Sequence, residues 1–211
     1  MNTVHIAVII PTWQEATTIA TCLDQLVVQI PPFSVVVVDG GSTDATIAIA
    51  NSYSDRLPLR CVISPQRGRA AQMNWGAQHC DPAAEVLLFL HADSLLPTAG
   101  LAAIRDGIGG RLGGRFRVQL DDDRWPYRLI SWGINSRSQI TGAFTGDMGI
   151  YPPQLFSAAR RISRVAPDWR ISRSRSSYPM PAFYLRWSLP PVVAGSSTAP
   201  GELSPSCKSS V

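Results

Sequence analysis

Charged and polar side chains occur in four short segments, each of which directly follows a run of apolar residues. These segments begin at Pro11, Asp39, Pro65 and His91, and they read PTWQE, DGGSTD, PQRGR and HADS. Carboxylates accept hydrogen bonds and bind cations, whereas the guanidinium groups of arginine bind phosphate oxygens. Together these residue types could hold a molecule with a polar ring and a diphosphate.

Two of the four segments suit the two ends of such a molecule. The carboxylate of Asp39 can accept hydrogen bonds from a base or a ribose, and the glycines that follow it let the backbone approach closely. Arg67 and Arg69 flank Gly68 at the predicted start of a helix, where guanidinium groups and the helix dipole both favour an anion. We therefore expect a nucleotide beside Asp39 and a phosphate beside the arginines.

Asp93, in the fourth segment, is a candidate ligand for a divalent cation. One or two protein carboxylates suffice for Mg²⁺ when phosphate oxygens complete its coordination shell. Each candidate also has a structural alternative. Asp39 could belong to a plain tight turn, the arginines could be solvated surface charges, His91 could be a hydrogen-bonded core histidine, and Asp93 could cap the following helix. The functional interpretation depends on all four segments converging at one place.

The elements between these segments alternate between strand and helix. Short β-branched runs predict strands, and apolar residues at spacings of three and four predict amphipathic helices. The expected strands are His5–Ile10, Val35–Val38, Leu59–Ile63 and Glu85–Leu90; the expected helices are Glu15–Gln29, a helix with Ser42 as its N-cap, and Arg67–Cys80. This alternation predicts an α/β fold with a doubly wound, mostly parallel sheet of the Rossmann-like type. The carboxyl ends of parallel strands meet at one edge of the sheet, where ligands bind.

The remainder of the chain divides near residue 157. Residues 98–108 and Trp125–Ile140 are expected to be helices, and Gly114–Leu120 alternates like a strand. Residues 157–211 contain 13 serines and 7 prolines and keep no apolar period. We therefore expect one domain over residues 1–156, with a ligand-binding half in residues 1–95, and an irregular or disordered tail over residues 157–211.

Charge and cysteine content limit the classes of partner. The net charge is +4, and residues 151–211 hold eight basic and two acidic side chains. We interpret these basic groups as solvated charge, and we expect no nucleic-acid partner. The four cysteines have neither metal-ligand spacing nor a disulfide pattern, which fits the cytoplasm. No apolar run approaches the ~20 residues of a transmembrane helix and no signal peptide is evident, so any membrane contact is expected to be peripheral, at the inner face.

The order of these segments resembles a known family. The strings IAVIIPTWQE, VVVVDGGSTDAT, RGRAAQMNWGA and LLFLHADSLLP are similar to those of the family 2 inverting glycosyltransferases, which have the GT-A fold. More narrowly, they resemble the bacterial branch described as radical-SAM/selenodomain-associated transferases. The resemblance covers roughly residues 5–151, and the combination of motifs is more specific than any one of them.

The resemblance implies roles for the residues that match the family's motifs. The acids at Glu15 and Asp39 would contact the nucleotide, commonly uridine, and Asp44 would lie near the base. The arginine–glycine turn would lie beside the donor. The implied nucleotide-sugar-binding residues are Pro11, Thr12, Glu15, Asp39, Gly40, Ser42, Asp44, Arg67, Gly68 and Arg69.

The family's acid-x-acid metal motif corresponds to His91-Ala92-Asp93. The resemblance implies that Asp93 binds Mg²⁺ or Mn²⁺, with His91 secondary. Residues 146–149 (GDMG) resemble a segment near the family's acceptor pocket, and this makes Asp147 the candidate catalytic base. The family's later Gly-Gly-Phe turn and acidic pair have no match after Leu155. We interpret this change as a shifted reading frame or a replaced C-terminus.

The sequence therefore predicts a metal-assisted glycosyltransferase. Its donor would be a nucleotide diphosphate-sugar, expected to be a UDP-sugar, and its acceptor a hydroxyl group of unspecified identity. Two alternatives stay open. A sugar-phosphate nucleotidyltransferase would need a glycine-rich loop after the first strand, where this chain has PTWQE. A non-catalytic nucleotide-sugar-binding remnant would explain the missing acidic pair, since inverting transfer requires a general base.

Overall fold

The computed structural model describes residues 3–108, 114–120, 124–141, 149–153 and 183–187. Its strands are β1 (Ile6–Thr12), β2 (Phe33–Asp39), β3 (Leu59–Ile63), β4 (Val86–Phe89), β5 (Ser94–Leu95), β6 (Gly114–Leu120), β7 (Gly149–Tyr151) and β8 (Phe183–Trp187). Its helices are α1 (Ile19–Val27), α2 (Thr46–Asn51), α3 (Arg69–Gln78), α4 (Gly100–Ile108) and α5 (Trp125–Thr141).

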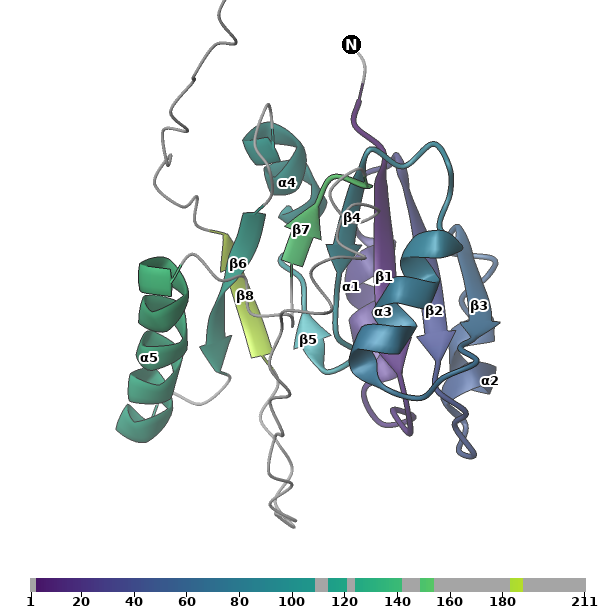
Figure 1. The fold of residues 1–211 in the computed structure, drawn as a ribbon, viewed down its shortest axis with the longest axis horizontal. Helices are drawn as coiled ribbons and strands as arrows, with labels where there is room; N and C mark the ends of the chain where they lie inside the picture. Colours follow the sequence, from purple (N-terminus) through teal and green to yellow (C-terminus); the bar gives the residue numbers. More distant parts are fainter. Residues whose placement is uncertain (1–2, 109–113, 121–123, 142–148, 154–182, 188–211) are drawn as a thin grey trace, which may run out of the picture.

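The strands form one sheet in the order β3-β2-β1-β4-β7-β6-β8-β5 (Figure 1). The first four of these strands are parallel to one another. β7 then lies between β4 and β6 and runs antiparallel to both. The predicted α/β fold with a doubly wound, mostly parallel sheet is confirmed.

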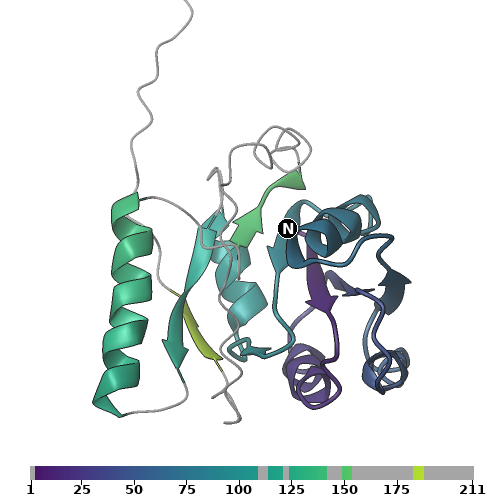
Figure 2. The same cartoon turned by 60° about the horizontal axis from the view of Figure 1, so that its bottom comes forward.

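The central strand β1 is buried along its whole length, so its two faces support two separate layers. Ile6, Val8 and Ile10 face a core that includes side chains of α1, α2 and α4. Ala7 and Ile9 face the other core, under α3. Figure 2 shows α1 and α2 on one side of the sheet and α3 on the other. Such two-sided burial explains why these strands read as continuous apolar runs.

Two features of the structure differ from the sequence-based expectations. Ser42 does not cap a helix: α2 begins at Thr46, and its N-cap residue, Ala45, makes no side-chain capping bond. The Ser42 hydroxyl bonds to the Asp39 carboxylate instead. In the tail expected to be irregular, the described residues 183–187 form a strand, β8, which pairs with β6 and β5. Its sequence FYLRW is rich in residues that favour strands, and most of the remaining tail lies outside the described residues.

The described residues include three cysteines, and their helices can be compared with the length that a membrane span needs. Cys22, Cys61 and Cys80 are free thiols. Burial raises the pKa of the Cys22 thiol to about 12 and that of Cys61 to about 11, which disfavours the reactive thiolate near neutral pH. Over the described ranges, no helix is both long enough and apolar enough to cross a bilayer.

Candidate functional site

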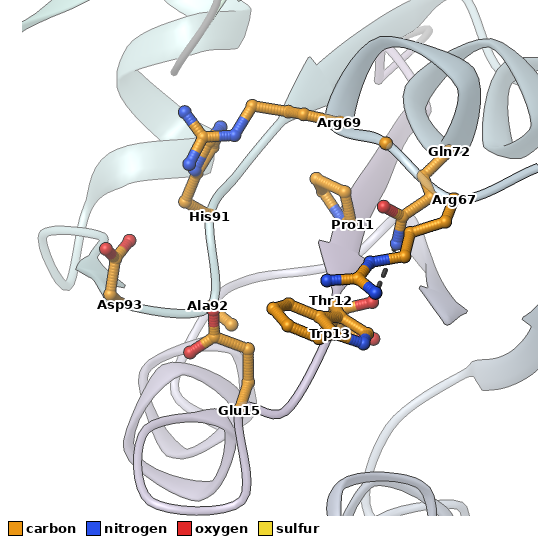
Figure 3. A pocket seen from close by; sticks show the side chains of 11 residues that line it. Pro11, Thr12, Trp13, Glu15, Arg67, Arg69, Gln72, His91, Ala92 and Asp93 are labelled. Atoms are coloured by element: carbon orange, nitrogen blue, oxygen red, sulfur yellow. Dashed lines mark hydrogen bonds between the residues drawn. The ribbon is translucent and has the colours of Figure 1, made fainter. Parts of the chain in front are cut away.

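A pocket of about 310 Å³ lies at the carboxyl edge of the parallel strands (Figure 3). It brings together eight of the residues singled out in the sequence: Pro11, Thr12, Glu15, Arg67, Gly68, Arg69, His91 and Asp93. Trp13, Gln72 and Ala92 also line it. Three of the four polar segments thus supply its walls, as expected for the edge at which open α/β sheets bind ligands.

The remaining polar segment, DGGSTD after β2, adjoins the pocket and is folded around the Asp39 carboxylate. This side chain is buried, and its Oδ2 accepts hydrogen bonds from the backbone N–H of Gly41 at 2.8 Å and of Ser42 at 2.7 Å. Its Oδ1 accepts from the hydroxyls of Ser42 and, at 3.4 Å, of Thr12. An ionised carboxylate has about four acceptor positions. A ligand that bonds to Asp39 must therefore displace one of these donors, and the longest of the four bonds is that of Thr12.

Gln14 joins the turn after β1 to the turn after β2. Its backbone N–H donates to the Ser42 hydroxyl at 2.9 Å and its side-chain amide donates to the Thr43 hydroxyl at 2.8 Å. Its side-chain carbonyl accepts from the N–H of Asp44 at 3.2 Å. Gln14 itself has a φ of 57°, which is uncommon for a residue with a side chain. The bonds to the neighbouring turn hold it in this conformation.

Asp44 lies on the surface and orders the start of α2. Its carboxylate accepts hydrogen bonds from the N–H and the hydroxyl of Thr46 and, at 3.2 Å, from the N–H of Ala16. The Thr46 hydroxyl bond is the main reason why the pKa of Asp44 is lowered. Asp44 and Ser42 do not line the pocket. Their hydrogen bonds go to residues of the turns beside it.

Gln72 attaches helix α3 to strands β1 and β2 at the pocket. This residue was not identified in the sequence. Its side-chain amide donates to the carbonyl of Thr12 at 2.7 Å and to that of Val38 at 2.8 Å. A Cβ at Gly40 would lie 3.1 Å from this amide, so a side chain there would crowd it. The one available signal was its position four residues before Gly76 on the buried face of α3.

Trp13 was also missed, although it lies within the PTWQE segment. The Arg67 guanidinium carbon is 3.4 Å from the centroid of the Trp13 ring, and Figure 3 shows the guanidinium lying over the indole. Gly68, the residue before α3, has a φ of 135°, a conformation that favours glycine. The predicted arginine–glycine turn at the start of a helix is therefore present, with both arginines at the pocket.

The acids of the pocket influence each other. Burial raises the pKa of the Glu15 carboxyl above its ordinary value; the hydrogen bond from Thr18 acts in the opposite direction, and the Asp93 carboxylate raises it further. Asp93 accepts a hydrogen bond from the Ser94 hydroxyl at 3.4 Å. It does not cap α4, which begins at Gly100. The alternative of a helix-capping Asp93 is therefore not supported.

His91 and Arg69 form the far wall of the pocket. His91 is buried, and Figure 3 shows the Arg69 guanidinium on the same side of the pocket as His91. No group of three or more potential metal-binding side chains exists among the described residues. The carboxylates of Asp93 and Glu15 line the same pocket, and Mg²⁺ is usually bound by one or two carboxylates plus phosphate oxygens. This donor set fits a cation that arrives with a phosphate ligand.

Asp147, the candidate base, lies outside the described residues. The strand that begins two residues later is described: β7 pairs antiparallel with β4, with Leu88 opposite Ile150 and Leu87 opposite Tyr151. The start of β7 at Gly149 is therefore beside the end of β4 that leads to His91.

The chain is similar to curated proteins along about half of its length. It is 38% identical over 107 residues to the PGL/p-HBAD biosynthesis glycosyltransferase of Mycobacterium bovis (strain BCG / Pasteur 1173P2), and the alignment covers 49% of this chain and 41% of that protein. A protein of the same name from Mycobacterium tuberculosis (strain ATCC 25177 / H37Ra) matches equally. The chain spans less than half the length of these relatives.

Solved structures share the fold. The mannosyltransferase PcManGT of Pyrobaculum calidifontis, in complex with GDP-Man and Mn²⁺, is 25% identical with a TM-score of 0.56, covering 74% of this chain and 46% of that one. Residues 1–349 of S. aureus TarS are 23% identical with a TM-score of 0.52, covering 74% and 49%. Glucosyl-3-phosphoglycerate synthase of Mycobacterium tuberculosis, in complex with UDP, is 16% identical with a TM-score of 0.50, covering 73% and 58%. The last two likenesses concern the fold alone.

A family comparison covers most of the chain. The family described as glycosyl transferase family 2 matches residues 7–163, which is more than half of the sequence and extends past residue 151, where the similarity of the quoted motifs ends. The matched range contains all four polar segments, β1 except for Ile6, and the described strands from β2 to β7. The chain belongs to glycosyl transferase family 2.

Proposed function

We propose that this family 2 glycosyltransferase transfers a sugar, with inversion, from a nucleotide diphosphate-sugar to an acceptor hydroxyl, and that its donor is a UDP-sugar. The observation that carries the proposal is the pairing of Arg67 and Arg69 with Glu15 and Asp93 in one pocket. The cationic pair suits a diphosphate, and the carboxylates suit a cation and hydroxyl groups. The GDP-Man and Mn²⁺ bound to the 25% identical mannosyltransferase PcManGT support the class of donor.

The arginines would supply the main chemical assistance from the chain itself. When the sugar leaves, negative charge develops on the nucleoside diphosphate, and fixed donors aimed at that charge stabilise the transition state. Arg67 and Arg69 both line the pocket on either side of Gly68. Pro11, Thr12 and the turn from Asp39 to Ser42 would support the nucleotide. Asp39 would act chiefly by shaping that turn, because its acceptor positions are already used.

A divalent cation, Mg²⁺ or Mn²⁺, fits the carboxylate side of the pocket. Asp93 would hold it and His91 would be secondary, since both line the pocket. When bound, such a cation would neutralise charge on the departing diphosphate. Inverting transfer also requires a base within hydrogen-bond reach of the attacking hydroxyl. We propose Asp147 for this role; its support is the position of Gly149, two residues later, beside β4.

Calorimetry with UDP and with GDP, in the presence of Mn²⁺, tests the donor class. Asp93→Asn is expected to weaken Mn²⁺-dependent binding of UDP, and His91→Ala to weaken it less. Asp55→Asn, a matched change at an exposed acid outside the pocket, is expected to leave binding unchanged. A wild-type protein that binds neither nucleotide would overturn the proposal. Tight binding of the donor without transfer or hydrolysis would support the non-catalytic alternative.

A further inference from the structure

Trp13 and Arg67 form an unusually close pair at the mouth of the pocket. The guanidinium carbon lies 3.4 Å from the centroid of the indole, and both residues line the pocket (Figure 3). The other arginine–aromatic pairs in the described part of the chain, Arg56 with Tyr53 and Arg124 with Tyr127, are each separated by 5.1 Å. The closer pair is therefore the one beside the candidate diphosphate position.

The aromatic ring is the main contact that holds the Arg67 side chain. Within the described ranges, its guanidinium makes no ion pair with a carboxylate and no hydrogen bond. A guanidinium stacked on an aromatic face keeps its five N–H donors in its own plane, directed away from the ring. Arg67 is thus oriented while its donors stay available for a ligand.

The backbone on both sides fixes the partners of this stack. Gln14, next to Trp13, is held in its left-handed conformation by Ser42 and Thr43. Gly68, next to Arg67, has a φ of 135°. A side chain at Gly68 would be strained in this conformation. The two loops therefore meet in one defined arrangement, with the ring and the guanidinium in contact.

We propose that Trp13 is a positioning residue: it holds the Arg67 guanidinium against its ring so that a diphosphate meets an already oriented arginine. An arginine side chain loses much rotational freedom when it binds an anion, and prior ordering reduces that cost. The inference rests on the proposed function, because it assumes a nucleoside diphosphate ligand. A different role for Trp13, direct stacking on the base of the ligand, would make the same residue important for a different reason.

The two roles differ in the part of the ligand that responds to substitution. If Trp13 acts through Arg67, then Trp13→Leu weakens binding of the diphosphate about three- to tenfold and leaves binding of the corresponding nucleoside unchanged. Arg67→Met causes a similar loss, and the double variant loses no more than Arg67→Met alone. Trp13→Phe keeps an aromatic face and binds like the wild type.

The experiment is a double-mutant cycle measured by calorimetry with Mn²⁺ present. The probes are whichever of UDP and GDP binds the wild type, and its nucleoside. Arg56→Met removes an arginine from the Tyr53 ring outside the pocket and serves as the matched control. Thermal unfolding verifies that each variant is folded, and Trp13→Met replaces Trp13→Leu if the latter does not fold.

The outcomes separate the two proposals. A loss of nucleoside affinity equal to the loss of diphosphate affinity, or an effect of Trp13→Leu that persists in the Arg67→Met background, overturns the positioning role. Failure of the wild type to bind UDP or GDP instead contradicts the proposed function, and the positioning role with it. A loss confined to the diphosphate and absent without Arg67 supports the inference.

Discussion

Replacing Gln72 by leucine should loosen the contact between α3 and the ends of β1 and β2. Gln72 is 4% exposed, and its amide donates to the carbonyls of Thr12 and Val38 at 2.7 and 2.8 Å. Each such bond contributes about 1 kcal/mol net, so their combined loss costs about 2 kcal/mol. The Thr12 carbonyl keeps a donor, because the Gly40 N–H bonds to it at 2.9 Å. The Val38 carbonyl lies 3.4 Å from the Thr12 hydroxyl, which can donate to it in place of Asp39. Leucine also has a similar volume, so a cavity adds little.

For a protein of this size, about 2 kcal/mol lowers the melting temperature by about 4–8 °C. Thermal unfolding followed by circular dichroism measures this change. Gln78→Leu is the matched control: it makes the same substitution on the same helix at an exposed position, and should shift the melting temperature little. Equal melting temperatures for the two variants would refute the view that the Gln72 amide fastens the helix to the strands.

Three further predictions follow from the same turns and helices. A Cβ at Gly76 would lie 2.5 Å from Ile9 Cγ2, so Gly76→Ala should destabilise by about 1–3 kcal/mol in urea unfolding, whereas Gly133→Ala, with open space, should not. Asp39→Ala leaves the N–H groups of Gly41 and Ser42 without acceptors and should weaken UDP binding about tenfold. Asp39→Asn keeps one acceptor oxygen and should weaken UDP binding less. Calorimetry that finds the larger loss for Asp39→Asn would contradict this role of the carboxylate. Burial raises the folded-state pKa of Glu15 above 4.5, so ionisation of Glu15 costs stability as the pH rises through that pKa. Glu15→Gln should therefore raise the melting temperature at pH 7 more than at pH 4. Equal shifts at the two pH values would count against a raised pKa of Glu15.

The parallel half of the fold was predictable from the sequence. β1 and β2 are apolar on both faces, and α1 carries a clear three- and four-residue period. β7 and β8 were not predicted. A three-residue strand such as Gly149–Tyr151 has too few residues to show a period, and its identity as a strand depends on pairing with β4 and β6, far away in sequence.

The site was predictable as a set of turns and not as a network. Strand ends in a parallel sheet must converge, so the pocket positions of Glu15, Arg67 and Asp93 followed from topology. Which side chain bonds to which could not be read from spacing. Ser42 looked like a helix cap, because serine before a helix usually is one. In the folded chain, the Ser42 oxygen accepts from the Gln14 N–H, and the Ser42 hydroxyl donates to the Asp39 carboxylate.

The bonds between Gln14 and the turn at 42–44 limit how this protein can be re-engineered. Exchanging the turn at residues 42–44 alone for that of a relative would remove the hydrogen-bond partners of the Gln14 amide and backbone N–H. The two turns, 28–30 positions apart in sequence, therefore form one exchangeable unit. A chimera intended to alter nucleotide preference should transplant the segment around Gln14 together with the segment around Ser42, and libraries should vary both at once.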